Sequence, residues 1–99
     1  MPQIDISEIE ALLNDWWEQA EVILGNGFRS LSEKDLAIKH HIRQHHEVQI
    51  NVLVERIKME IAALRGNIDD QLVEQNRQDQ VDRIDTLENL EERLRQLLD

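Results

Sequence analysis

Cysteine is absent from the sequence, and helix-breaking and aromatic residues are scarce: there are one proline, three glycines, two tryptophans and one phenylalanine. Without a thiol the chain has no disulfide, no thiolate metal site and no cysteine nucleophile, which fits a reducing compartment. With so few aromatic residues, any core must be built from leucine, isoleucine and valine. The shortage of proline and glycine, with abundant glutamate, glutamine, leucine, arginine and aspartate, is typical of long helices rather than sheets.

Basic residues are fewer than acidic ones: the sequence has 11 lysines and arginines and 21 aspartates and glutamates, which gives a formal net charge of −10. Nucleic acids and anionic membrane surfaces both require clustered positive charge, so neither is an expected partner. No apolar run approaches the length of about 20 residues that spans a bilayer, and no basic residue precedes the first apolar positions as in a secretory signal. We expect a soluble cytoplasmic protein with a single helical domain, residues 1–99.

Motifs for catalysis are missing as well. Ser7 and Ser32 are accounted for as helix caps, Ser30 lies in a loop, and nothing places a hydroxyl nucleophile beside a base and an acid. There is no glycine-rich phosphate loop, no histidine has a glutamate three residues before it as in di-metal bundles, and "HEVQI" lacks the second histidine of the zinc-protease motif. The sequence therefore favours a protein that is not an enzyme and needs no cofactor.

The charge that is present is divided unevenly along the chain. Residues 1–24 hold six acids and no base, residues 25–66 hold five acids and seven bases, and residues 67–99 hold ten acids and four bases. The three net charges are −6, +2 and −6, which sum to −10. Surface ion pairs contribute about 0–1 kcal/mol each, so this pattern directs partner choice and orientation more than stability.

The first helix is predicted over about residues 7–24. Ser7 and Glu10 have the spacing of a capping box, and apolar residues recur on one side of the helix with acids on the other. Trp16 lies in the middle of the apolar stripe and is expected in the core. Trp17 lies at its edge, where it either borders the core or contacts a partner, as tryptophans do at interface hot spots.

Two longer helices are predicted after the first, whose end is marked by Gly25 in the left-handed cap conformation. The second covers about residues 33–65 and is expected to be unbroken, about 50 Å long, because no glycine or proline precedes Gly66. The third covers about residues 68–98, and its apolar side chains recur about every 3.5 residues, which predicts supercoiling against a neighbouring helix. Residues 74–80 lack apolar side chains, and the sequence does not decide whether they are helical. The fold class is all-α, a short amphipathic helix followed by a long antiparallel helical hairpin.

The second helix is apolar on two sides. One side carries Leu36, Ile50, Leu53, Ile57, Ile61 and Leu64, and the other carries Val48, Val52, Met59 and Ala63. A helix with two apolar sides has neighbours on both, so we expect a homodimer that forms a helical bundle, with a single elongated three-helix bundle as the alternative. The expected interface residues are Trp17, Val48, Val52, Leu53 and Ile57.

All four histidines fall in "HHIRQHH", residues 40–46. Of these, His41 and His45 are one helical turn apart, the spacing at which two imidazoles can hold one metal ion, although a zinc site needs further ligands. In the alternative interpretation no metal is bound: His41 and His45 pack in the contact between two helices, and His40 and His46 lie nearer the surface.

Two functional hypotheses follow. The favoured one is a non-enzymatic protein–protein interaction or regulatory protein that acts as a homo-oligomer and has a protein partner. The alternative is a metal- or small-molecule-binding helical bundle, with or without catalysis, centred on the cluster from His40 to His46.

Overall fold

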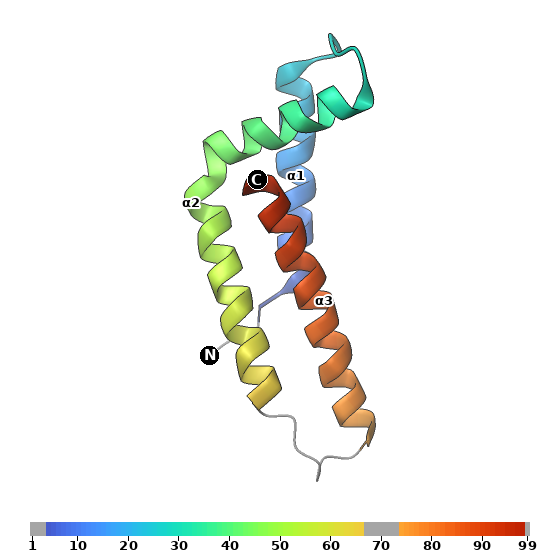
Figure 1. Ribbon diagram of the computed structural model, residues 1–99, viewed down its shortest axis with the longest axis vertical. Helices are drawn as coiled ribbons and strands as arrows, with labels where there is room; N and C mark the ends of the chain where they lie inside the picture. The colour runs from blue at the N-terminus through green and yellow to red at the C-terminus, as the bar shows by residue number, and fades with distance from the viewer. Residues whose placement is uncertain (1–3, 67–73, 99) are drawn as a thin grey trace.

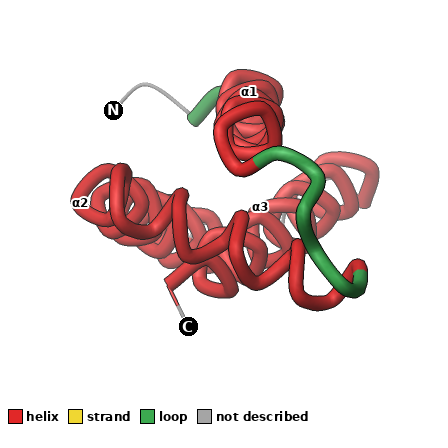
Figure 2. Tube along the Cα trace, turned by 90° about the horizontal axis from the view of Figure 1, so that it is seen from above, coloured by secondary structure: helices red, strands yellow, loops and turns green. Residues whose placement is uncertain are grey.

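The computed structural model describes residues 4–66 and 74–98. These residues form three helices and no strand: α1 (Ile6–Leu24), α2 (Leu31–Gly66) and α3 (Glu74–Leu98) (Figure 1). The C-terminal half of α2 descends beside the ascending α3, and α1 lies across one face of this pair (Figure 2). The all-α fold with a helical hairpin that the sequence predicts is confirmed.

The first helix is capped by Asp5, and the predicted capping box at Ser7 is wrong. Asp5 has an extended backbone, and its carboxylate accepts a hydrogen bond of 3.2 Å from the N–H of Glu8. Its negative charge also suits the positive end of the helix dipole. At the other end Gly25 has a φ of +72° but a ψ of −155°, so it ends the helix at positive φ without the predicted left-handed helical conformation. Its N–H donates to the Glu21 carbonyl at 3.0 Å.

The second helix begins at Leu31 because Ser30, and not Ser32, caps it. The Ser30 hydroxyl accepts a hydrogen bond of 3.1 Å from the N–H of Glu33, and Ser32 is exposed in the first turn. Several residues before each helix have suitable capping side chains, and the sequence does not show which of them takes the extended backbone that a cap requires. Both predicted caps failed for that reason.

The second helix bends at His46, where φ is −133° and ψ is 16°. Residues 31–45 cross over the end of the other two helices, whereas residues 47–66 run alongside α3 (Figure 1). The prediction of an unbroken helix is therefore wrong. Sharp kinks usually occur at proline or glycine, and neither residue is present at this bend. The bend allows both halves of α2 to pack on one core.

The core is aliphatic, as predicted, and all three helices contribute to it. Ile38 and Ile42, each 1% exposed, fill it from the first half of α2. Leu36, which a straight helix would place on the core side, is 67% exposed because the kink turns that face outward. The second half of α2 adds Ile50, Leu53, Val54, Ile57 and Ile61.

The third helix begins at Glu74, so residues 74–80 are helical, and the predicted start over residues 68–73 lies outside the described residues. Its apolar stripe is buried as expected. The buried members are Ile84, Leu87, Leu90, Leu94 and Leu97.

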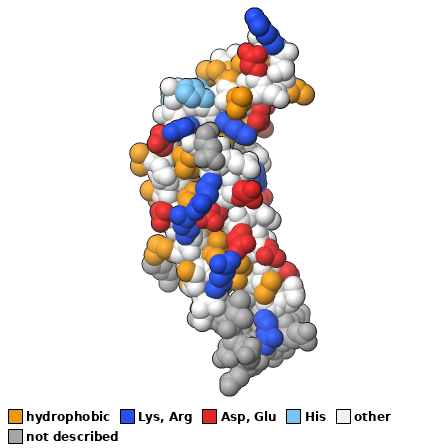
Figure 3. Space-filling view, in the orientation of Figure 1, with side chains coloured by type: hydrophobic (Ala, Val, Ile, Leu, Met, Phe, Trp, Pro, Cys, Tyr) orange, Lys and Arg blue, Asp and Glu red, His pale blue; other side chains and the backbone are white. Residues whose placement is uncertain are grey.

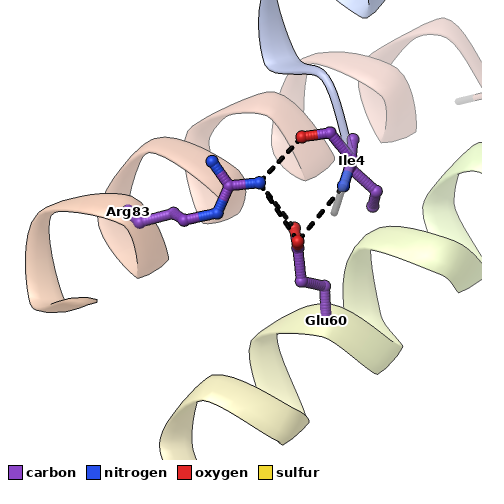
Figure 4. A network of polar contacts seen from close by, with 3 residues as sticks. All are labelled: Ile4, Glu60 and Arg83. Atoms are coloured by element: carbon purple, nitrogen blue, oxygen red, sulfur yellow. Dashed lines mark hydrogen bonds and ion pairs between the residues drawn. The ribbon is translucent and has the colours of Figure 1, made fainter. Parts of the chain in front are cut away.

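A partly buried ion pair ties the chain before α1 to both helices of the hairpin (Figure 4). Arg83 donates hydrogen bonds of 3.1 and 3.3 Å to the two carboxylate oxygens of Glu60 and one of 2.7 Å to the Ile4 carbonyl. The Ile4 N–H in turn donates to Glu60 Oε1 at 3.2 Å. The side chains of Arg83 and Glu60 are only 26% and 14% exposed, so these charge-assisted bonds are less screened than a surface pair. We call Ile4, Glu60 and Arg83 the clasp.

Replacement of Arg83 by methionine should lower the free energy of unfolding by about 1–3 kcal/mol, because it leaves the Glu60 carboxylate and the Ile4 carbonyl without their donor. Urea denaturation followed by circular dichroism measures the loss. Arg95→Met is the matched control, since Arg95 pairs with Glu91 on the surface and its removal should cost less than about 0.5 kcal/mol. Equal losses in the two variants would show that the clasp is worth no more than a surface pair.

Candidate functional site

Three large apolar side chains lie exposed along one side of the second half of α2. Val48 is 79% exposed, Val52 51% and Met59 56%. Their spacing places them on one helical face, opposite the side that packs against α3. Hydrophobic side chains are visible along this edge of the molecule in Figure 3. We call Val48, Val52 and Met59 the outer stripe; exposed apolar surface of this kind marks interaction sites.

The predicted interface residues of α2 lie on opposite sides of the helix. Val48 and Val52 belong to the outer stripe. Leu53 and Ile57 are 7% and 0% exposed and lie in the core, where α3 covers them. An interface between two folded chains therefore needs other residues, and Met59 is one that the sequence-based assignment omitted although it had the same spacing.

Trp17, the remaining predicted interface residue, lies on α1. It is half-buried at the edge of the core, and its indole N–H donates a hydrogen bond of 2.8 Å to Glu21. Beside it is a surface hollow of about 320 Å³ where the three helices meet, bordered by Lys39 and Arg93. Trp17 therefore lies on α1, apart from the outer stripe of α2, and its N–H is already bonded within the chain.

The kink divides the histidine cluster. His46 stacks on Trp16, with ring centres 4.4 Å apart and planes 10° apart, so the prediction that His46 lies nearer the surface is wrong. His41 and His45 lie on the N-terminal side of the kink, with ring centres also 4.4 Å apart and planes tilted by 47°. His40 is exposed and joins neither pair. Rotation of the backbone at His46 is what carries its ring to Trp16 and away from the others.

His41 and His45 are thus brought together as their spacing predicts, but no third ligand lies beside them among the described residues. Among residues 4–66 and 74–98 no group of three or more histidines or carboxylates is arranged to hold a metal ion. Imidazoles one turn apart can still act as a two-point ligand. The cluster as a whole, from His40 to His46, does not converge on one point.

Comparison with known proteins assigns no family to this chain. No family model, characterised protein or solved structure matches it. Within the part of the chain that the structure describes, no helix is long and apolar enough to cross a bilayer. Two surface features remain as candidates for function, the outer stripe and the pair formed by His41 and His45.

The contact with Trp16 changes the proton affinity of His46. Burial lowers the pKa of His46 below its usual value of 6.5, and the neighbouring imidazoles of His45 and His41 lower it further by repelling a positive charge. The folded chain therefore binds a proton at His46 less readily than the unfolded chain does.

The free energy of unfolding should fall as pH is lowered from about 7.5 to about 5.5, because below pH 6.5 the unfolded chain binds more protons at His46 than the folded chain. Above this range His46 is neutral in both the folded and the unfolded chain, so its contribution to the free energy of unfolding does not change with pH. Melting curves for wild type, His46→Gln and His40→Gln measure the effect. The slope with pH should be smaller in His46→Gln and unchanged in His40→Gln; equal slopes in all three would contradict the role of His46.

Proposed function

We propose that the protein is a non-enzymatic interaction protein that self-associates as a symmetric homodimer through the outer stripe. The observation that carries this proposal is the exposure of Val48, Val52 and Met59 on the side of α2 that faces away from its own core. A homodimer about a two-fold axis uses the same patch on both copies, so one apolar stripe is sufficient.

The distribution of charge supports a second copy as the occupant. The segment that contains α2, residues 25–66, has a net charge of +2, whereas residues 1–24 and 67–99 each have −6. Two copies that meet through α1 or α3 would bring acidic surfaces together. Two copies that meet through α2 bring together the only segments without excess negative charge, so repulsion is least in this arrangement.

The charges beside the outer stripe favour a parallel pairing of the two α2 helices. Glu55 lies on one edge of the stripe, where it forms an exposed ion pair of 3.4 Å with Lys58. Arg56 lies on the other edge and forms no ion pair with another described residue. In a parallel pair related by a two-fold axis, the edge with Arg56 in one copy faces the edge with Glu55 in the other. The arrangement supplies each Arg56 with a carboxylate.

The association is expected to be weak. The core is complete within one chain, with Ile50, Ile57, Leu87 and Leu94 almost fully buried, so the monomer does not need a partner to fold. Three exposed side chains on a helical segment about 17 Å long cover less than the roughly 800 Å² per partner of a stable dimer. We therefore expect dissociation in the micromolar range, set by the concentration of the protein.

The double variant Val48→Glu/Val52→Glu should remain monomeric, because four carboxylates would meet at the interface. Size-exclusion chromatography with light scattering, run over a series of concentrations, should show the wild-type mass rising from 11.7 kDa toward twice that value and the variant unchanged. Leu36→Glu is the matched control, being on α2 and 67% exposed but off the stripe. A wild-type mass of one chain at every concentration would exclude the dimer.

Exchange of the flanking charges tests the parallel arrangement. Arg56→Glu should weaken the dimer several-fold, at roughly 0.2–1 kcal/mol per pair lost, and Glu55→Arg/Arg56→Glu should restore it. Sedimentation at low and high salt measures the dissociation constants of wild type and of both variants. The difference between wild type and Arg56→Glu should shrink at high salt, because salt screens the charges. If Arg56→Glu leaves the dissociation constant unchanged, these charges do not face each other.

A further inference from the structure

The pair formed by His41 and His45 has no partner within the described part of the chain except other imidazole rings. Neither residue makes a hydrogen bond or ion pair with a described residue, and their ring centres are 4.4 Å apart. His46, the other nearby histidine, is occupied by its stack on Trp16, and the His45 and His46 rings are 6.5 Å apart. The ring nitrogens of His41 and His45 are therefore available to a ligand.

The separation of the two rings matches the geometry of metal chelation. When one nitrogen of each imidazole lies about 2.0–2.1 Å from a shared ion, the ring centres are about 4.5 Å apart for a right angle at the metal and about 5.2 Å apart for a tetrahedral angle. The observed 4.4 Å is closer to the first of these distances than to the second. Right angles between ligands are preferred by Cu²⁺ and Ni²⁺ in tetragonal or octahedral sites.

We infer that His41 and His45 form a two-ligand site for a divalent late transition-metal ion, Cu²⁺ or Ni²⁺, in each chain. Water completes the coordination, since no third protein ligand lies within the described residues. Imidazole nitrogen binds these ions in preference to Mg²⁺ and Ca²⁺, which require oxygen ligands. The net charge of −10 raises the local concentration of cations around the molecule. His41 and His45 are not members of the outer stripe.

Trp16 provides an optical signal for the site. It stacks on His46, which lies beside His45, so an ion at the pair is close to the indole. Cu²⁺ quenches tryptophan emission at short range.

Calorimetric titration of the untagged chain with Ni²⁺ and Cu²⁺ tests the inference. We expect one ion per chain, tighter binding of Cu²⁺ than of Ni²⁺, and no binding of Mg²⁺. His41→Gln and His45→Gln should each weaken binding at least about tenfold, because one imidazole cannot chelate, and His40→Gln should leave the affinity unchanged. The same ions should raise the melting temperature and quench emission in wild type but not in His41→Gln/His45→Gln.

The titration is repeated on Val52→Glu/Met59→Glu to separate this site from self-association, because neither new carboxylate lies within one helical turn of His45. Binding of one ion per monomeric variant chain supports the inference, whether or not the wild-type chain dimerises. Half an ion per chain in wild type, lost in this variant, would show that the ion requires two chains and would overturn the single-chain site. Unchanged affinity in His41→Gln/His45→Gln, or no binding by wild type, would overturn it as well.

Discussion

The bend of α2 at His46 is the constraint on which the rest of the structure depends. A straight helix of this length would pack against α3 and extend past the end of the bundle, leaving Ile38 and Ile42 without neighbours. With the bend, the first half of α2 covers the ends of α1 and α3, and both isoleucines are 1% exposed. The stack of His46 on Trp16 lies at the bend and joins α2 to α1 at that point. Burial of apolar surface on both sides of the kink offsets the departure from helical geometry.

Closure of the core within one chain determines what remains on the surface. Helices α1 and α3 together cover the inner side of α2, and the clasp holds Ile4 against Glu60 and Arg83, so the buried core of the described residues is formed within one chain. The outer stripe lies outside this core. This is why we propose a weak association of folded chains instead of the intertwined bundle that two-sided hydrophobicity suggests in isolation.

The same bend separates two kinds of histidine. His46 becomes part of the packing between α1 and α2, with its proton affinity lowered by burial, whereas His41 and His45 stay together on the outer part of the helix. A histidine packed on Trp16 and the pair that we propose as a metal ligand thus lie within one short stretch.

Composition and periodicity were enough to predict three helices, an aliphatic core, a central place for Trp16 and the proximity of His41 to His45, because each depends on residues within one or two turns of each other. They did not predict which residues cap α1 and α2, because Asp5, Ser7, Ser30 and Ser32 are all acceptable locally. They also placed Leu53 and Ile57 at an interface, although α3 covers both. The clasp and the stack on Trp16, which lies at the kink, join residues far apart in the chain. Such contacts form only when the three helices pack their apolar faces into one core.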